Sequence, residues 1–299
     1  MSQLISEVHV RQFKDNLTML YQQTQSRLRG TVMERSVTGE VDFWDRVGVT
    51  NAQQKLTRHT DTPQIDTPFS RRMCTVGDWH TGDLIDKQDV IRVLTDPTSP
   101  TTQAIVAALN RALDSIIYAA FDAAVLTGKL GTTTVSFDAD WPNGNRAAGQ
   151  GDDDFSAAAI DIDDLLALKK QFDENEVPDE GRHILLSPGG FTQLLTTAEV
   201  GSSDYNTVKA LVRGEIGTYL GFNFHRLATT QMTVATGTDF YCYAWHQSAM
   251  GLSVGLNLNV EVAPRTDKSF ATQVYAALSA GAVRVQGEGL IRFLIDNAA

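Results

Sequence analysis

The span from residue 31 to residue 75 constrains the fold most, because it lacks the apolar side chains that a compact segment needs. In its first part, large apolar residues lie two or four positions apart, which predicts a strand with its bulk on one face: Val37, Val41, Phe43, Val47 and Val49. A polar stretch at 51–61 follows, and then come Asp61-Thr62-Pro63 and Asp66-Thr67-Pro68. Proline removes a backbone donor and forces its predecessor towards extended geometry. We therefore expect an extended, two-legged excursion that is either disordered or lies on another subunit.

The composition is that of a folded protein of one or two domains. The chain has 299 residues and a mass of 32.7 kDa, and 42% of its residues are apolar. No apolar run reaches the roughly 18 residues of a membrane span, and residues 1–11 lack the apolar core of a secretion signal. Cys74 and Cys242 are expected to be buried thiols in a reducing compartment. We expect a soluble protein that is made inside the cell.

The charge is acidic and unevenly distributed. The net charge is −11, and residues 101–200 alone carry 6 basic and 16 acidic side chains. A protein that grips nucleic acid needs basic groups that displace counterions from phosphates. No basic stripe of this kind is present, so the pattern disfavours a nucleic-acid-binding protein and indicates a solubilising surface.

Helices are predicted from three- and four-residue spacing of apolar residues. Residues 2–29 are expected to form an amphipathic helix or arm that Gly30 ends. The clearest helix spans residues 100–127, with Ser99 as its N-cap and Gly128 as its stop. Asp161 caps a second helix. Three more are expected: a short one between residues 76 and 93, one that begins at Ser187-Pro188, and one around residues 208–214.

Strands are predicted from short apolar runs and from period-two spacing, at residues 183–186, 219–224, 241–245, 256–262 and 272–297. The turn Gln286-Gly287-Glu288-Gly289 predicts that the last two strands form a hairpin. Residues 158–260 then form a mixed unit, while the long helix and the C-terminal strands pack on each other from distant parts of the chain. The fold class is α+β, with one domain inserted into another.

No arrangement of residues indicates catalysis. Gly287-Glu288-Gly289 lacks the third glycine of a dinucleotide loop. The acidic run Asp152-Asp153-Asp154 fits a solvated loop better than a cation site, because consecutive carboxylates point in different directions. Ser187 begins a helix and is no nucleophile elbow, and Asp78-Trp79-His80 is too short a pattern to indicate proton transfer. We predict that the protein is not an enzyme and has no catalytic residue, cofactor or metal.

Several segments, taken in order, resemble one known family. The loop carries Arg58-His59-Thr60-Asp61-Thr62-Pro63 and Asp66-Thr67-Pro68-Phe69-Ser70-Arg71-Arg72, and Asp83-Leu84-Ile85-Asp86 follows. Beyond the long helix come Ile184-Leu185-Leu186-Ser187-Pro188, then Gly214-Glu215-Ile216-Gly217 with Gly221-Phe222, then Val262-Ala263-Pro264-Arg265-Thr266-Asp267-Lys268 and Gly281-Ala282-Val283-Arg284. Over nearly the whole chain this order resembles the major capsid proteins of tailed bacteriophages, which have the Hong Kong 97-type fold.

The resemblance implies an N-arm at 1–30, an extended loop at 31–75, a peripheral domain with the spine helix at 76–157, an axial domain at 158–260, and return strands of the peripheral domain at 261–299. It implies hexamers and pentamers in an icosahedral head shell that holds double-stranded DNA without sequence-specific binding, in a virion assembled in the host cytoplasm. A separate scaffolding protein is implied because the arm starts near residue 1, with a portal, an optional decoration protein and no membrane. Cross-linking is not expected, since Lys55 is the only lysine of the loop and has no identifiable partner.

Charged residues of the loop are candidate contacts between subunits. Arginine binds carboxylates through two parallel hydrogen bonds, which suits an interface. The candidate arginines and carboxylates are Arg58, Arg71 and Arg72 with Asp83, Asp86 and Asp89. The arginines are equally compatible with a solvated loop. Two other functions stay open: a cellular, encapsulin-like shell protein that encloses a cargo enzyme, and a hydrolase whose acidic connector at Asp152 binds a metal.

Overall fold

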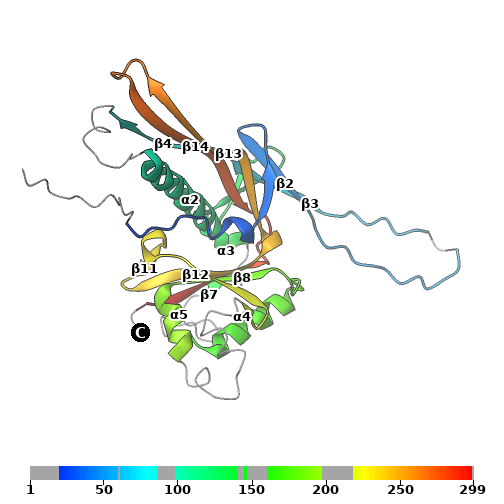
Figure 1. Ribbon diagram of the computed structural model, residues 1–299. Helices are drawn as coiled ribbons and strands as arrows, with labels where there is room; N and C mark the ends of the chain where they lie inside the picture. The colour runs from blue at the N-terminus through cyan, green and yellow to red at the C-terminus, as the bar shows by residue number, and fades with distance from the viewer. Residues whose placement is uncertain are drawn as a thin grey trace, which may run out of the picture. The chain divides into compact units, whose positions relative to one another are not determined.

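The longest helix of the computed structural model is α2, Thr98–Asp122 (Figure 1). The structure describes residues 20–59, 61–86, 98–140, 145–146, 160–196 and 218–297. The predicted helix 100–127 is confirmed over most of its length, but it ends at Asp122 because Val125–Thr127 forms strand β5. Within the described chain, α2 alone is long and apolar enough to cross a membrane by length and composition. However, 50% of its most apolar window is buried in the fold, as in a core helix.

Asp114, in the middle of α2, is buried and binds the chain that precedes the first strand. Its carboxylate accepts hydrogen bonds from Ser26 Oγ at 2.5 Å and from the amides of Arg27 at 3.0 Å and Leu28 at 3.1 Å. Residues 20–28 are not helical, and a short 3-10 helix, η2 (Arg29–Thr31), follows them. Of the two alternatives predicted for residues 2–29, the helix is therefore wrong in the described part, which is an arm, because Asp114 takes amides that a helix would bond internally. Residues 1–19 lie outside the described residues.

The strands of the described residues form three sheets. The first has the order β1 (Met33–Ser36), β13 (Met250–Arg265), β14 (Ala271–Arg284) and β4 (Gly77–Ile85). The second has the order β2 (Val41–Val47), β3 (Phe69–Thr75), β5 (Val125–Thr127) and β6 (Thr133–Val135). The third has the order β7 (Asn145–Arg146), β15 (Leu290–Asp296), β12 (Asp239–His246), β8 (Arg182–Leu186), β10 (Phe222–Arg226) and β9 (Thr218–Tyr219), and β11 (Val234–Thr236) pairs with β12. The shorter helices are α3 (Phe137–Asp140), α4 (Ile162–Glu174), α5 (Pro188–Thr196), η4 (Thr229–Gln231) and η5 (Gln247–Ala249).

The third sheet follows the sequence pattern closely. All residues of β8 are buried, and the strands predicted near 183, 219 and 241 are confirmed as β8, β9–β10 and β12. Helices α4 and α5 lie against this sheet (Figure 1). Helix α4 begins at the predicted Asp161 cap, which exchanges side-chain-to-backbone hydrogen bonds with Asp164. Ser187 Oγ accepts the Gly190 amide at 3.0 Å and caps α5. The helix predicted at 208–214 lies outside the described residues.

Two predictions are wrong, one about a helix and one about a hairpin. Residues 77–85 form strand β4 instead of a helix, next to β14, and at Gly82 an added Cβ would lie 3.1 Å from the Val274 carbonyl oxygen. The last two strands do not form a hairpin, because β14 and β15 belong to different sheets. The turn between them bonds elsewhere: the Val285 amide donates to the Ala249 carbonyl at 2.8 Å, and β15 pairs antiparallel with β12.

The strands at either end of the extended loop are fixed by a hydrophobic cluster. Trp44 of β2 and Cys74 of β3 are buried with Val125, Val283 and Val285. Trp44 Nε1 donates to Ser253 Oγ at 3.0 Å, and a Cβ on Gly251 would lie 2.6 Å from the indole ring. The expectation that all of residues 31–75 lacks a core is therefore corrected. The described residues of 48–68, between β2 and β3, lack contacts with this hydrophobic cluster.

Three buried charged side chains tie β3 to the rest of the fold. Arg72 of β3 and Arg284 of β14 both pair with Asp140 of α3, Arg284 at 3.1 Å. Arg284 also donates to the carbonyls of Phe121 (2.8 Å) and Ala123 at the end of α2. Burial lowers the pKa of Arg284, and the bond to Asp140 opposes that shift. Because Arg72 is buried and paired within its own chain, its predicted contact with another subunit is corrected to an intramolecular one.

A pair of histidines lies within the third sheet. His183 Nδ1 and His225 Nε2 are 3.0 Å apart, and His183 stacks on Trp245 with ring centroids 5.6 Å apart. Burial, with a smaller contribution from His225, lowers the pKa of His183 to about 4. Burial also lowers the pKa of His225. Both rings are therefore neutral at pH 7.

The described chain divides into two compact units, each built from separate stretches. One contains Met1–Gln25, Asp78–Ala112 and Leu256–Leu278, and the other contains Ser26–Gly77, Leu113–Gly255 and Ser279–Ala299. The extended loop and all three members of the Arg72–Asp140–Arg284 cluster belong to the second unit. So the loop and its anchor are parts of one compact body.

Replacing Asp140 tests the buried cluster. The variant Asp140→Asn leaves two buried guanidinium groups without their shared carboxylate, so we expect it to lower the free energy of unfolding by about 3 kcal/mol in urea titrations. The matched control is Asp138→Asn on the same helix. Asp138 pairs with Arg292 at 3.2 Å with its side chain 65% exposed, so we expect a loss below about 1 kcal/mol. Equal losses in the two variants would show that the cluster does not stabilise the fold.

The histidine pair predicts a loss of stability in acid. The folded-state pKa of His183, about 4, lies below the ordinary value of 6.5, so between these values the unfolded chain binds more protons. Stability should fall as the pH drops through this window, with a contribution from His183 of about 1 kcal/mol at pH 5. Urea titrations at pH 7 and pH 5 should show a smaller loss for His183→Gln than for the wild type. The control His80→Gln, at an exposed ring, should behave as the wild type, and an unchanged loss in His183→Gln would refute the assignment.

Candidate assembly site

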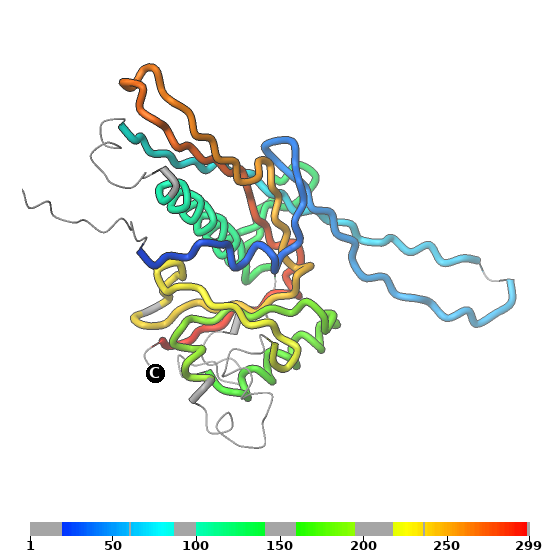
Figure 2. Tube along the Cα trace, viewed as in Figure 1, coloured from blue at the N-terminus to red at the C-terminus, as the bar shows by residue number. Residues whose placement is uncertain are grey.

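The extended loop, residues 48–68, is exposed over almost its whole described length. It leaves the ends of β2 and β3 and runs away from the second sheet (Figure 2). The Gly48 amide donates to the Pro68 carbonyl at 2.8 Å and closes its base. Beyond that contact every described residue from 49 to 66 is exposed, including Val49 at 90% and Leu56 at 82%. The predicted two-legged excursion is confirmed for this part, which packs on nothing else in the described chain.

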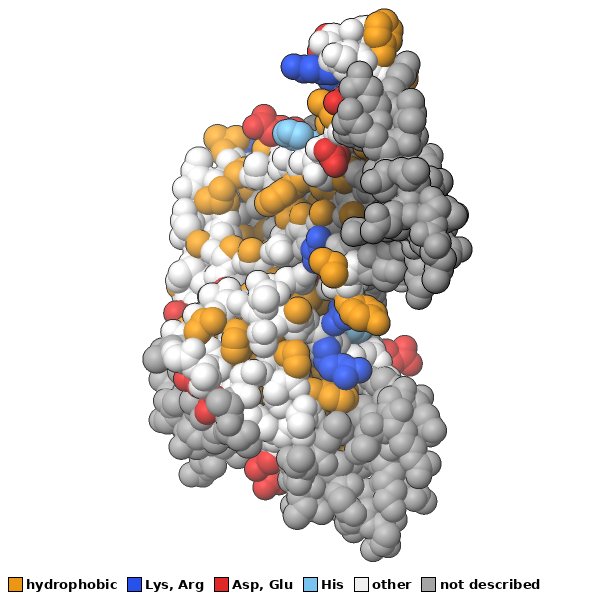
Figure 3. Space-filling view, turned by 60° about the vertical axis from the view of Figure 1, so that its left-hand side comes forward, with side chains coloured by type: hydrophobic (Ala, Val, Ile, Leu, Met, Phe, Trp, Pro, Cys, Tyr) orange, Lys and Arg blue, Asp and Glu red, His pale blue; other side chains and the backbone are white. Residues whose placement is uncertain are grey.

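Exposed hydrophobic side chains occur at the foot of the loop as well. Phe69 and Val47 face each other across β2 and β3, are 76% and 64% exposed, and line a hollow with Thr127 and Lys129. On the face shown in Figure 3, hydrophobic side chains are dispersed among polar atoms instead of forming one patch. On this face the apolar surface is therefore distributed in small areas, which suits several modest contacts better than one large one.

The remaining candidate contact residues are placed as follows. Arg58 lies near the tip of the loop, exposed, and within the described chain it has no ion pair with Asp83 or Asp86. Asp83 on β4 and Asp86 just beyond it are both exposed. Arg71 pairs with Asp45 on the neighbouring strand at 2.9 Å, so it already has a partner in its own chain. Asp89 lies outside the described residues.

The titratable groups offer no reactive centre in the described part of the chain. No cluster of histidine, cysteine or carboxylate side chains there has the arrangement of a metal site, and Asp152-Asp153-Asp154 lies outside it. Both cysteines are free and buried. Burial raises the pKa of Cys74, and it raises the pKa of Cys242 to about 12, so both thiols stay protonated.

Sequence reasoning missed the residues that anchor the loop. Asp140 and Arg284 carry the main polar contacts at the base of the loop, yet no local pattern marks them. One signal was present in Gly281-Ala282-Val283-Arg284. A Cβ on Gly281 would lie 2.2 Å from the Thr75 carbonyl oxygen, so the glycine allows β14 to approach β3 where Arg284 meets Arg72 and Asp140.

The sequence matches the family described as "Phage capsid protein" over residues 5–297. No curated protein matches it. Similar solved structures include the capsid of cyanophage P-SCSP1u, with 12% identity and a TM-score of 0.73 over 97% of this chain and 94% of that chain. The capsid asymmetric unit of cyanophage Pam1 has 12% identity and a TM-score of 0.73 over 98% of both chains. A structure of Mycobacterium phage Che8 has 16% identity and a TM-score of 0.66 over 98% of both chains.

The identities are low, so the structural likeness shows the fold alone, and the predicted Hong Kong 97-type capsid fold is confirmed. The family match independently indicates a structural role, that of a capsid subunit. It gives no support to a hydrolase or to a cellular shell protein. Because that match extends over nearly the whole sequence, the chain belongs to the phage capsid protein family.

Proposed function

We propose that this protein is the repeating subunit of a closed icosahedral head, arranged as hexamers and pentamers around packaged double-stranded DNA. The observation that carries this proposal is the loop at 48–68, which is exposed along its length and yet fixed at its base. A rigid base sets the direction of the loop, and a neighbouring copy supplies the surface that orders it.

Burial of the loop on a neighbour provides the stabilising contact. Val49 and Leu56 are almost fully exposed, and burying one such side chain contributes roughly 1.5–3 kcal/mol before the entropy of ordering is subtracted. Each contact is therefore modest. Because every subunit touches several neighbours, the closed shell is held by the combined effect of many such contacts.

Charge pairs between copies fix the register of the loop. Arg58 is the candidate arginine that has no carboxylate partner in the described part of its own chain, and Asp83 and Asp86 are exposed carboxylates on a different compact unit. We assign Arg58 to one of these carboxylates on a neighbouring copy. Asp89 remains a candidate contact residue from the sequence alone.

The remaining features of the proposal follow the family resemblance. Residues 31–75, which contain the exposed loop at 48–68 and the strands at its base, serve as the loop region of the capsid fold. Residues 76–157 and 261–299 serve as the peripheral domain, and residues 158–260 serve as the axial domain. Strand β15 pairs within the sheet that belongs to the axial domain. A separate scaffolding protein guides assembly in the host cytoplasm, a portal occupies one vertex, a decoration protein is optional, and no catalytic step is involved. The DNA is enclosed without sequence-specific contacts.

Replacing the loop tests whether it acts only between subunits. Residues 51–66 are exchanged for a short Gly-Ser turn, which keeps Gly48 and Pro68 in place. The isolated variant should unfold at the same urea concentration as the wild type, because the removed residues bury nothing. Co-expressed with its scaffold, it should give no closed particles in electron micrographs. An unfolded subunit, or normal shells, would contradict the proposal.

A charge exchange tests the assigned pair. Arg58→Glu should abolish shell formation, measured by sedimentation and electron microscopy, because it places like charges together. Adding Asp83→Arg or Asp86→Arg should restore shells and identify the partner. The matched control is Lys55→Glu, the same charge change three residues away, which should assemble. Failure of both rescues, or an equal defect in the control, would remove Arg58 from the interface.

A further inference from the structure

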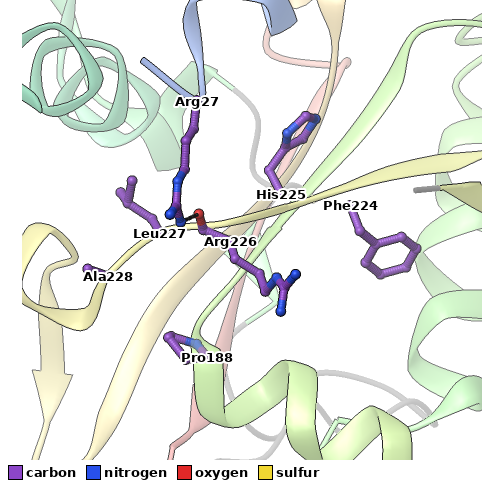
Figure 4. Close-up of a pocket in the computed structure, with 7 residues that line it drawn as sticks. All are labelled: Arg27, Pro188, Phe224, His225, Arg226, Leu227 and Ala228. Carbon is purple, nitrogen blue, oxygen red and sulfur yellow. Dashed lines mark hydrogen bonds between the residues drawn. The ribbon is translucent and has the colours of Figure 1, made fainter. Parts of the chain in front are cut away.

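A hollow of about 700 Å³ lies along the free edge of strand β10, beside the start of α5 (Figure 4). Strand β9 pairs only with Phe222 and Asn223, so within the described chain no strand covers the following residues on that side. Arg27, Phe224, Arg226 and Leu227 line the hollow. All of them belong to one compact unit.

Both arginines are held in place by contacts that leave donors unused. The backbone of Arg27 is bound to Asp114, and its Nη1 donates to the Arg226 carbonyl at 2.6 Å. The guanidinium of Arg226 lies 4.4 Å from the centre of the Phe191 ring on α5. Each contact restricts its side chain before any ligand arrives, which lowers the entropic cost of binding.

The two arginines lack the carboxylate partners that most other arginines of this acidic chain have. Within the described residues no Asp or Glu forms an ion pair with Arg27 or Arg226, and none lines the hollow. Described arginines that do have such a partner are Arg29, Arg35, Arg46, Arg71, Arg72, Arg182, Arg265, Arg284 and Arg292. Two positive charges that line one hollow and have no carboxylate partner among the described residues form a local site of positive potential in a protein of net charge −11.

We propose that this hollow binds a phosphate group through Arg27 and Arg226. Guanidinium groups donate parallel hydrogen bonds to phosphate oxygens, and the hollow is large enough for a phosphate that carries an organic substituent, with Phe224 as an apolar lining residue. The phosphate comes either from free inorganic phosphate or from the backbone of a nucleic acid.

The side chain of His225 and the first amides of α5 are not the groups that would bind the phosphate. The His225 side chain points to the other side of the strand (Figure 4), where its ring contacts His183. At the start of α5, the Gly189 amide donates to Asn297 Oδ1 and the Gly190 amide to Ser187 Oγ, so both are already used. The two arginines therefore carry the site.

The test uses the full-length, unassembled subunit, so its outcome does not depend on shell formation. Inorganic phosphate is titrated by calorimetry at constant ionic strength in sodium chloride. We expect saturable binding to one site that weakens at least about tenfold in Arg27→Gln and in Arg226→Gln. The matched control is Arg58→Gln, which removes an exposed arginine of the loop and should leave the affinity unchanged. Thermal melting checks that each variant is folded.

A short thymidine oligonucleotide then distinguishes the two sources. Competition between the oligonucleotide and phosphate at this site, lost in Arg226→Gln, supports a nucleic-acid phosphate as the ligand. Saturable phosphate binding without competition supports the free anion. Binding that does not saturate, or that weakens equally in Arg58→Gln, overturns the proposal.

Discussion

One buried carboxylate joins the elements on which the loop depends. Asp140 of α3 pairs with Arg72 of β3 and Arg284 of β14, and Arg284 also bonds the carbonyls at the end of α2. Buried ion pairs of this kind add little net stability, but removing one member leaves an uncompensated charge. The cluster therefore acts as a constraint on geometry. It fixes the strand from which the loop emerges.

The loop differs from its base, because its side chains are exposed and not buried. Its proline-rich, polar composition gives it nothing to bury within its own subunit, and its described residues from 49 to 66 are exposed. In the proposed shell, this exposed surface becomes buried only when a neighbouring copy covers it. A chain of this kind stays folded as a free subunit and gains further order in an assembly. The contrast between a fixed base and an unsupported span is the structural basis of the proposed shell.

The sequence predicted local structure well where local chemistry decides it. The Asp161 cap of α4, the Ser187 cap of α5 and the buried strand β8 all follow from patterns within a few residues. The bare loop was also predictable, because two Asp-Thr-Pro tripeptides and a polar stretch exclude a core.

The predictions that failed concern residues whose partners are distant in the sequence. Arg72 looked like an interface arginine because its partner Asp140 is 68 residues away. Asp114 binds the chain that precedes the first strand, 87 residues away, and no local pattern indicates this contact. Strand β4 was predicted as a helix because its pairing with β14 cannot be read locally.

Hydrogen exchange measured on the loop, in the free subunit and in the assembled shell, tests the central idea most directly. The account predicts that amides between residues 49 and 66 exchange at nearly the unprotected rate in the subunit and become strongly protected in the shell. Over the same step, β8 should stay protected in both states. Protection of the loop already present in the isolated subunit would show that it folds on its own chain, and fast exchange in the finished shell would show that no neighbour orders it.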